Sequence, residues 1–597
     1  MVESFAYQTL GSLIASTRVS LCTKLRNELL HAFYFRRMRM DKFNELRNRD
    51  DLADFLNISH KWLNYILYAK GVDNCYSTFE IPKKSGGTRE ISAPSYELKI
   101  IQKKLSLKLQ EYQKNLWKKR KISPNISHAF ERDKSIITNA FIHRNKRYVL
   151  NIDLENFFDT IHFGRVSGFF QKHHDFNLPY KVATIIAQLS CYKGALPQGA
   201  PSSPVIANMI CQSLDIRVLS IAKKYKLDYT RYADDLTFST NYKNFLKNKD
   251  NFLNDIKTEI KRAGFKINEK KTRLLFRDSR QEVTGLVVNK KINVPKKFIK
   301  DTRAMAYRLY TTGEFMINDQ KGTLEQLEGR FSFIDQLDKY NNKIDTINRH
   351  NMFNLNSRER EYKKFLFFKY FFSNEKPLII TEGKTDIRYI KAALKNKYVS
   401  YPDLIERKKD GSFIFKISFF KRTKRWKYFF DMSVDGADAM KKLYEGLTNK
   451  FSYMPYFEEI TNKLAQKPII FIFDNETETD RPLKKFLSTA KVSDDDKNLL
   501  QKRLYIPLNK NIFLVTNPLK QDKKESEIED LFPEEVLSHK IKGKKFTKND
   551  KYDFKKYYGK NDFSNYIMKN YKKINFTNFR RLLNAIEQIQ KNTSKNE

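Results

Sequence analysis

Two adjacent aspartates, Asp234 and Asp235, lie in the middle of a short segment whose flanks favour strands. The flanking residues 227–230 and 236–240 are rich in aromatic and β-branched side chains, so the segment predicts a strand, a tight turn and a second strand. Side chains alternate between the faces of a continuous strand, but a hairpin turn can bring consecutive carboxylates near one point. Such carboxylates repel unless a cation lies between them. The segment therefore indicates a divalent-metal site, and the alternative is a solvated Asp-Asp turn.

A third carboxylate follows a second strand-like run. Residues 148–152 lead into Asp153, after which the chain turns toward a Phe-rich stretch. An aspartate at the end of a buried strand costs free energy unless it is paired or bound to a metal. Asp153 is therefore the natural partner of the two aspartates, whereas Glu155 and Asp159 are interpreted as caps or surface charges.

The charge balance indicates the class of partner. Lys and Arg number 113 against 69 Asp and Glu, a formal net charge of +44, while 40% hydrophobic residues suffice for folded cores. Phosphate neutralisation makes nucleic acid the first choice of polyanion, with a membrane surface as the competitor. No run reaches the length expected of a membrane span, and no signal peptide is evident. Four scattered cysteines fit reduced thiols in a cytoplasmic protein.

A basic hairpin is expected near the start of the chain. Residues 78–91 read as two strands joined at Gly86-Gly87, with Lys and Arg along both arms. Arg89 is the candidate for phosphate contact because its guanidinium fork matches phosphate geometry. Residues 1–75 have helical spacing of apolar side chains. Farther on, Gly199-Ala200 lies in a rigid turn of glycines and prolines that permits close backbone approach by a ligand.

The order of these motifs resembles the fingers and palm of reverse transcriptases, and more narrowly those of bacterial retrons. The resemblance spans about residues 75–290. It rests on Asp153 followed by Phe157-Phe158, on Leu196-Pro-Gln-Gly-Ala-Pro-Ser-Ser-Pro204, on Tyr232-Ala-Asp-Asp235 and on Gly264 with Lys271-Thr272. The retron subgroup's boxes appear as Asn139-Ala140-x-x-His143 and Val283-Thr284-Gly285, which the resemblance implies serve RNA recognition.

The resemblance implies a two-metal polymerase site. Asp153, Asp234 and Asp235 would hold two Mg²⁺ ions, which prefer carboxylate and phosphate oxygens. Phe158 resembles the position that stacks under the sugar and rejects a 2′-hydroxyl. Gln198 and Gly199 would border the nascent base pair, and Lys271 resembles a residue proposed to protonate pyrophosphate. Residues 293–355 then read as a helical thumb and residues 356–375 as a connector.

A second set of acidic residues follows strand-like runs in the later part of the chain. Glu382 follows residues 377–381 and Asp474 follows residues 467–473, with a third acidic cluster at 525–532. Ligands of α/β sheets bind at the carboxyl ends of the strands. The pattern resembles a nuclease-type Toprim domain, which implies that Glu382 is an acid/base or ligand and that Asp474, Glu476 and Glu529 are ligands of one or two Mg²⁺ ions. Glu476 departs from the family's usual aspartate.

The predicted fold class is α/β: an α+β right-hand polymerase, followed by a Rossmann-like Toprim domain with a mainly parallel sheet. The predicted domains are 1–75 helical extension, 76–292 fingers and palm, 293–355 thumb, 356–375 connector, 376–540 Toprim and 541–597 basic C-terminal region. Interleaved Lys and Tyr in that last region suit either a nucleic-acid contact or a plain soluble surface.

The resemblance further implies the partners. They are dNTPs, a structured non-coding RNA that is both template and primer, and the branched single-stranded DNA made from it. The fused nuclease would act in anti-phage defence, restrained by these nucleic acids. Three alternatives stay open: an inert Rossmann-like accessory domain, an intron- or phage-type reverse transcriptase whose last domain only binds nucleic acid, and a non-catalytic RNA scaffold. The nuclease substrate and the oligomeric state, including a homo-oligomer, are left open.

Overall fold

The computed structural model forms two compact units, Met1–Pro295 and Lys296–Glu597, and each is described by itself. The structure describes residues 43–82, 86–122, 125–345, 350–432, 438–449, 452–465, 467–477, 481–520, 523–549 and 551–594. Of the predicted helical extension, residues 1–42 lie outside the described part of the chain. The described remainder is helical up to a π-helical turn at Tyr65–Ala69.

Helices dominate the start of the first unit. They are α2 (Arg49–Phe55), α3 (His60–Asn64), α4 (Tyr96–Arg120), α6 (Phe163–Lys172) and α7 (Tyr180–Ser190). Asn48 caps α2 by accepting hydrogen bonds from two backbone N–H groups of its first turn, which satisfies donors that a helix leaves unpaired. Leu52 and Phe55 of α2 and Leu105 of α4 are buried in one hydrophobic cluster.

The basic hairpin is present as predicted. Strands β1 (Tyr76–Pro82) and β2 (Thr88–Pro94) pair antiparallel, and Ile81 lies opposite Arg89. Gly86 and Gly87 have φ values of +86° and +77°, which glycine adopts readily. Residues 83–85 of the predicted turn lie outside the described residues.

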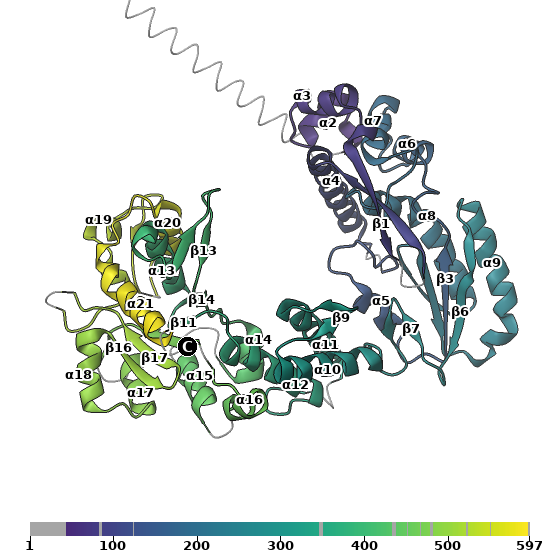
Figure 1. Ribbon diagram of the computed structural model, residues 1–597. Helices are drawn as coiled ribbons and strands as arrows, with labels where there is room; N and C mark the ends of the chain where they lie inside the picture. Colours follow the sequence, from purple (N-terminus) through teal and green to yellow (C-terminus); the bar gives the residue numbers. More distant parts are fainter. Residues whose placement is uncertain are drawn as a thin grey trace, which may run out of the picture. The chain divides into compact units, whose positions relative to one another are not determined.

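A four-stranded antiparallel sheet forms the centre of the first unit (Figure 1). Its order is β4 (Asp228–Tyr232), β5 (Asp235–Thr240), β3 (Tyr148–Leu154) and β6 (Ile267–Phe276). Two helices, α8 (Ser203–Lys224) and α9 (Lys249–Arg262), pack together over one face, where Phe238 of β5 meets Phe252 of α9 with ring centroids 5.1 Å apart. Because side chains alternate, Asp235 lies on the face opposite to Phe238.

Helix α8 corrects one expectation from the sequence. Within the described residues it is the one helix long and apolar enough to cross a membrane, although no run was expected to reach that length. In its most apolar window, 61% is buried inside the protein. Packing against β4 and α9 accounts for this burial and makes α8 a core helix.

Residues 282–287 form a small hairpin. It consists of β7 (Glu282–Val283) and β8 (Leu286–Val287), joined by Thr284 and Gly285, whose φ values are +47° and +80°. Positive φ values at both turn residues are typical of a two-residue hairpin turn. Helix α5 (Ile136–Ile142) packs on both strands.

The second unit begins with helices that share one core with the sheet that follows. The predicted thumb contains α10 (Lys296–Thr312) and α11 (Leu324–Ile344), with a two-residue hairpin, β9 (Met316–Ile317) and β10 (Gln320–Lys321), between them. Next come α12 (Ser357–Phe367) and a π-helical turn, Phe368–Phe372. Leu309 and Phe331 of the thumb are buried in the same cluster as Phe457 and Phe471. The compact unit therefore starts at Lys296 and includes the thumb.

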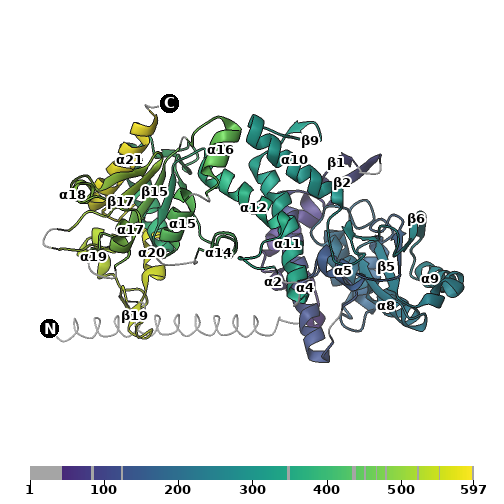
Figure 2. The same cartoon turned by 90° about the horizontal axis from the view of Figure 1, so that it is seen from below.

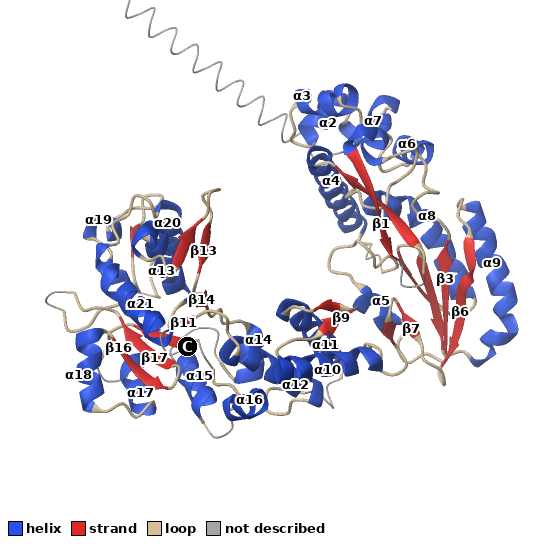
Figure 3. Ribbon diagram, viewed as in Figure 1, coloured by secondary structure: helices blue, strands red, loops and turns tan. Residues whose placement is uncertain are grey.

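A five-stranded, mainly parallel sheet organises the rest of the second unit (Figure 2). Its order is β14 (Ser418–Phe419), β11 (Leu378–Thr381), β15 (Ile469–Phe473), β17 (Ile512–Thr516) and β16 (Tyr505–Asn509), of which β16 is antiparallel. The three middle strands are almost wholly apolar, as expected where helices cover both faces of a parallel sheet. Figure 3 shows the helices around these strands. They include α13 (Lys384–Asn396), α14 (Lys424–Phe430), α15 (Asp438–Thr448), α16 (Met454–Thr461), α17 (Pro482–Thr489) and α18 (Asp494–Arg503). Two peripheral strands, β12 (Ile405–Arg407) and β13 (Phe413–Phe415), pair with each other.

The basic C-terminal region belongs to this core. After α19 (Glu534–Leu537), β18 (Lys545–Phe546) and β19 (Tyr557–Tyr558), helices α20 (Lys560–Asn570) and α21 (Arg580–Ser594) complete the chain. Phe563 of α20 and Leu583 of α21 are fully buried in one cluster with Ile470 and Val515 of the sheet. A boundary at 540 therefore does not separate an independent region, because its apolar residues cover one face of the sheet.

Candidate active sites

The hairpin between β4 and β5 holds the adjacent aspartates at its tip. Tyr232 pairs with Asp235, which leaves Ala233 and Asp234 as the two turn residues. Ala233 has a φ of +58°, a left-handed conformation that is unusual for a residue with a Cβ. On the neighbouring strand β3, Asp153 lies directly opposite Asp235, and the Leu154 N–H donates to the Asp234 carbonyl at 3.0 Å. Directly opposed residues share a face of the sheet, so the fold brings the three predicted carboxylates together.

The three carboxylates lie close enough to repel one another. Asp235 reaches solvent, yet protein atoms enclose its carboxylate closely enough that desolvation, together with the charges of Asp234 and Asp153, raises its pKa to about 7. Burial and the charge of Asp153 also raise the pKa of Asp234, while Lys271 and Arg89 act in the opposite direction. Mutual repulsion of this kind is relieved by divalent cations, so the donor set fits Mg²⁺.

Lys271 stands beside the carboxylates from the adjacent strand β6. Its Nζ lies 3.0 and 3.2 Å from the two carboxylate oxygens of Asp153, and Asn268 Nδ2 donates to Asp153 Oδ2 at 3.1 Å. The Lys271 side chain remains 56% exposed. It can therefore leave Asp153 without unfolding the strand.

The predicted nucleotide-contacting turn is joined to the basic hairpin. The Gln198 carbonyl accepts from the Ser92 N–H of β2 at 2.8 Å. Gly199 has a φ of +124°, and a Cβ there would lie 2.7 Å from the Ser92 carbonyl oxygen. Only glycine fits this close approach. Phe158 is half-buried against Phe157, with ring centroids 5.2 Å apart.

The two retron boxes lie inside the protein, which contradicts direct RNA contact by most of them. Asn139, Ala140, His143 and Val283 are almost wholly buried. The two ring nitrogens of His143 lie 2.7 Å from Thr230 Oγ1 and 2.8 Å from Ser239 Oγ.

Two further bonds complete this network. The Thr230 hydroxyl donates to Asn139 Oδ1 at 2.5 Å, and the Thr284 hydroxyl donates to the Ile136 carbonyl at 3.4 Å. These bonds fasten α5 and the β7–β8 hairpin to the central sheet. The boxes therefore have a structural role in this fold, with Thr284 half-buried and Gly285 exposed at the turn.

The second unit places its acidic residues at the carboxyl ends of adjacent parallel strands. Glu382 follows β11, Asp474 and Glu476 follow β15, and Asn517 follows β17. Asp474 accepts hydrogen bonds from Asn517 Nδ2 at 2.6 Å and from the Ile528 N–H at 2.8 Å. This second bond draws the segment that carries Glu529 toward the strand ends. The four residues predicted for this site thus lie near the carboxyl ends of the strands of one sheet.

Two residues of this cluster were missed by the sequence analysis. Asp386, in the first turn of α13, accepts from the Gly383 N–H at 2.7 Å. Lys560, at the start of α20, has its Nζ 3.2 Å from Glu527 Oε2 and 3.3 Å from Glu529 Oε2. The short spacing from Gly383 to Asp386 could have revealed the first, because it matches a helix cap. No local signal reveals Lys560, which only folding brings to the strand ends.

Burial and crowding raise the pKa of every acidic residue predicted here. Burial, followed by the charge of Glu529, raises the pKa of Asp386 to about 7. Burial and the charge of Asp386 raise the pKa of Asp474 well above its usual value, and burial does the same in smaller measure for Glu382, Glu476 and Glu529. The charges of Glu529 and Glu527, working against burial, raise the pKa of Lys560. Such carboxylates match the oxygen ligands that Mg²⁺ prefers.

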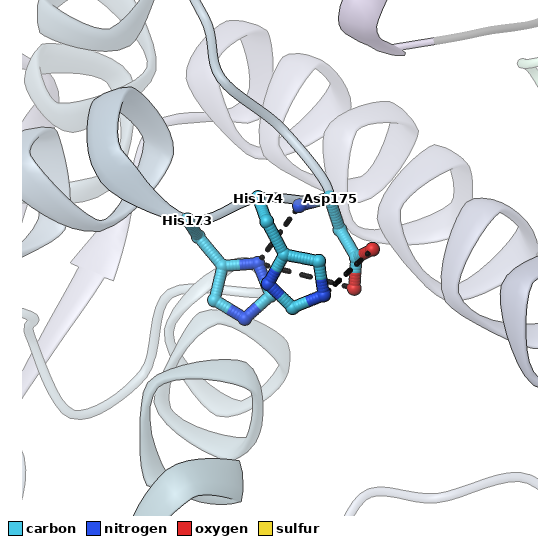
Figure 4. A group of neighbouring side chains, drawn as sticks. All are labelled: His173, His174 and Asp175. Carbon is cyan, nitrogen blue, oxygen red and sulfur yellow. Dashed lines mark hydrogen bonds and ion pairs between the residues drawn. The ribbon is translucent and has the colours of Figure 1, made fainter.

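Another group of potential ligands lies elsewhere in the first unit (Figure 4). Among the described residues, His173, His174 and Asp175 are the one set of three or more whose ligand atoms all lie within 4.8 Å of one another. Asp175 already binds the guanidinium of Arg120 through both carboxylate oxygens, and its N–H donates to His173 Nδ1 at 3.2 Å. An ion pair and a turn therefore account for this group without a metal ion. The two acidic sites differ from it, because each has a lysine beside its carboxylates.

Comparison with known proteins finds a family model and relatives for the first part of the chain. Residues 81–297 match the family model described as reverse transcriptase (RNA-dependent DNA polymerase). Retron Ec86 reverse transcriptase of Escherichia coli is 33% identical over 315 residues, which cover 52% of this chain and 90% of that protein. Retron Mx162 reverse transcriptase of Myxococcus xanthus is 31% identical, covering 51% of this chain and 66% of that protein.

Solved structures add little to this comparison. A telomerase from Candida albicans, in complex with a fragment of telomeric RNA, aligns over 50% of this chain and 60% of its own at 14% identity. Its TM-score of 0.29 is too low to bear on function. The sequence relatives are decisive, and the chain belongs to the retron reverse transcriptases, which are RNA-directed DNA polymerases.

Proposed function

We propose that Asp153, Asp234 and Asp235 form the Mg²⁺ site of the polymerase. The observation that carries this proposal is the convergence of the three carboxylates at one end of the sheet, where burial and the neighbouring carboxylates raise the pKa of Asp235 to about 7. Reverse transcriptase domains use Mg²⁺ at this site, and the bound ions supply charge neutralisation for the primer hydroxyl and the triphosphate. The carboxylates of this chain hold the ions and orient the two reacting ends.

The neighbouring residues position the nucleotide. Gly199 lets the backbone approach the nascent base pair closely, and Phe158 lies under the sugar. Arg89 pairs with the triphosphate, and Lys271 moves from Asp153 to the leaving pyrophosphate, where it donates a proton. The charges of Lys271 and Arg89 both lower the pKa of Asp234, which supports a place for these residues beside the reacting phosphates.

The RNA substrate follows from the relatives. We infer from the retron resemblance that the template is a structured non-coding RNA that also primes synthesis from one of its own 2′-hydroxyls, and the similarity to retron reverse transcriptases supports this. The product is then a branched RNA-linked single-stranded DNA. Sequencing the nucleic acid that co-purifies with the chain tests this: a 2′-branched RNA–DNA species supports it, and an unbranched RNA alone contradicts it.

Charge-neutral variants test the polymerase site. The double variant Asp234→Asn with Asp235→Asn removes two carboxylates at nearly constant volume, and cDNA synthesis on a supplied RNA should fall at least 1,000-fold, in line with the loss of electrostatic stabilisation of the transition state. Asp228→Asn, at the start of the same hairpin and paired with Lys146, is the matched control and should retain activity. Unchanged synthesis in the double variant would leave the non-catalytic scaffold as the explanation.

We further propose that the second unit is a Toprim-type nuclease that requires Mg²⁺. Support comes from five acidic residues at the carboxyl side of one mainly parallel sheet, namely Glu382, Asp386, Asp474, Glu476 and Glu529, joined by Lys560. The carboxylates would hold one or two ions, which lower the barrier to phosphodiester cleavage by neutralising charge. Lys560 lies 3.3 Å from Glu529 and opposes the rise in the pKa of Glu529 that burial causes. A defence role follows if the RNA and its DNA restrain this activity until infection.

The nuclease proposal competes with a domain that only binds nucleic acid. Glu382→Gln and Asp474→Asn separate the two, and Glu535→Gln, an exposed acid on α19, is the control. Variants are incubated with labelled RNA and DNA in Mg²⁺, and cleavage, binding and cDNA synthesis are measured. Loss of cleavage with retained binding and synthesis supports the nuclease. The unaltered chain is also tested after its RNA has been removed. If it then binds nucleic acid but shows no Mg²⁺-dependent cleavage, the result favours the binding module.

A further inference from the structure

The side chain directly before the Tyr232–Asp235 turn is completely buried. Arg231 is 0% exposed and is among the largest fully buried side chains of the described residues. A buried guanidinium is costly unless its donors are paired. Its partners therefore indicate what this position does.

The guanidinium spans two parts of the fold. On one side, Nε and Nη2 donate to the two carboxylate oxygens of Asp215, each at 2.8 Å. On the other, Nη1 donates to Asn208 Oδ1 at 3.1 Å and to the Ala233 carbonyl at 3.2 Å. Asp215 and Asn208 both belong to α8, which packs beside β4. Arg231 thus joins the core helix to the turn that carries the aspartates.

The backbone of Arg231 is fixed as well. Its N–H donates to the Ile126 carbonyl at 2.9 Å, and its carbonyl accepts from the His128 N–H at 2.8 Å. These two bonds hold the main chain of Arg231 in place. Its side chain can therefore restrain the turn through the bond to the Ala233 carbonyl. Ala233 adopts a φ of +58°, which residues with a Cβ leave readily when nothing holds them.

We propose that Arg231 is a positioning residue of the polymerase: its guanidinium, anchored by Asp215 and Asn208, holds the Ala233 carbonyl and so fixes the direction of Asp234 and Asp235. This inference rests on the proposed role of those two aspartates. The chemistry requires arginine, because a planar fork can serve a carboxylate with one edge and two further acceptors with the other. Lysine keeps the charge but offers a single ammonium that cannot span both sides.

The structure supplies a matched control in the same network. The hydroxyl of the buried Tyr229 donates to Asp215 Oδ1 at 2.9 Å. Tyr229→Phe removes a buried hydrogen bond from the same carboxylate without touching the turn. Tyr229→Phe should therefore lower the stability of the fold only, whereas Arg231→Lys should also disturb the geometry of the turn.

The experiment uses the full chain and a supplied primer–template. Single-nucleotide addition gives kcat and the KM for dNTP, binding gives the Kd for primer–template, and hydrogen exchange reports on the amides of 233–235. Arg231→Lys should lower kcat at least 30-fold, leave Kd within twofold and speed exchange at the turn at least tenfold. Tyr229→Phe should keep kcat within twofold. If Arg231→Lys fails to fold, Asp215→Asn, which weakens the anchor and leaves the arginine in place, should give the same pattern.

Two results would overturn the inference: a folded Arg231→Lys with kcat within threefold of the unaltered chain, or an equal loss of kcat in Tyr229→Phe. The Asp234→Asn with Asp235→Asn variant, measured in parallel, keeps this failure separate from failure of the proposed site. If that variant is inactive while Arg231→Lys is normal, the metal site stands and the role of Arg231 is excluded. If the double variant is active, the proposed site itself is wrong.

Discussion

Arg425 of α14 donates to Glu328 of the thumb helix α11 at 2.7 Å, and the second oxygen of Glu328 accepts from Lys369 at 2.9 Å. One carboxylate thereby joins three segments that the sequence analysis assigned to a thumb, a connector and a Toprim domain. Both basic partners are at least two-thirds buried, and so is Glu328. The thumb and the mainly parallel sheet are consequently parts of one folded body.

The first prediction concerns this carboxylate. Glu328→Ala removes the carboxylate that two partly buried cations share, and hydrogen bonds to charged groups contribute about 1.5–3 kcal/mol each, so the second unit should lose about 2–4 kcal/mol of stability. Glu325 is the control, because it also binds Lys369, at 3.0 Å, but its side chain is 77% exposed. Glu325→Ala should cost less than about 1 kcal/mol. Urea unfolding of the two variants checks this, and equal losses would contradict it.

A second prediction follows from the shared core. Phe457 of α16 is fully buried, with its ring centroid 5.0 Å from both Tyr310 of the thumb and Phe368 of the π-helical turn. Phe457→Ala should cost about 3–5 kcal/mol, and α10 and β15 should lose protection together because one cluster stabilises both. Hydrogen exchange on peptides from the two elements measures this. Continued protection of α10 while β15 opens would show that the thumb folds independently.

Local signals in the sequence were sufficient for the strands and for the acidic residues at their ends. The runs before Asp153, Glu382 and Asp474 are short and apolar, and each pattern is complete within a few residues. Lys560 lies far along the chain from Glu529, and only the packing of α20 on α13 brings the two within 3.3 Å. Convergence of this kind depends on long-range packing, which local patterns do not encode.

The family resemblance implied RNA recognition by the retron boxes, and burial of their residues does not fit direct contact. Asn139 and His143 are residues that often contact nucleic acids, yet here they are buried and hydrogen-bonded to Thr230 and Ser239. A sequence does not distinguish an exposed polar side chain from one whose partners lie on another strand. The C-terminal region posed the same problem in reverse, because its many lysines concealed apolar side chains such as Phe563 and Leu583 that complete the core.

The third prediction concerns the contact between the nucleotide turn and the basic hairpin. Gly199→Ala places a Cβ 2.7 Å from the Ser92 carbonyl oxygen at a φ of +124°, so β2 must shift. The KM for dNTP should rise at least tenfold, because Arg89 moves with that strand. Gly194→Ala is the control: its φ of +84° carries similar backbone strain, but no atom lies within 4 Å of the new Cβ. Steady-state kinetics of both variants provide the comparison, and equal KM values would exclude the clash as the cause.

The last prediction is the acid sensitivity of the first unit. Burial lowers the pKa of His143 to about 3 and that of His128 to about 4, against an ordinary value of about 6.5 in an unfolded chain. Between these values the unfolded state binds more protons than the folded state, so stability is complete above pH 6.5 and is lost as the pH falls. Each histidine should cost about 1 kcal/mol between pH 6.5 and 5.5.

A substitution assigns this loss to one side chain. His143→Gln should reduce the loss over that interval by about 1 kcal/mol, although the variant is less stable at neutral pH because the bonds to Thr230 and Ser239 are altered. His174→Gln, at a side chain that is 73% exposed, should leave the slope unchanged. Urea unfolding at pH 7.5 and 5.5, read by pulsed hydrogen exchange on peptides from β4 and β5, measures the slope for this unit alone. A slope unaltered by His143→Gln would mean that groups other than the buried histidine set the acid sensitivity of the palm.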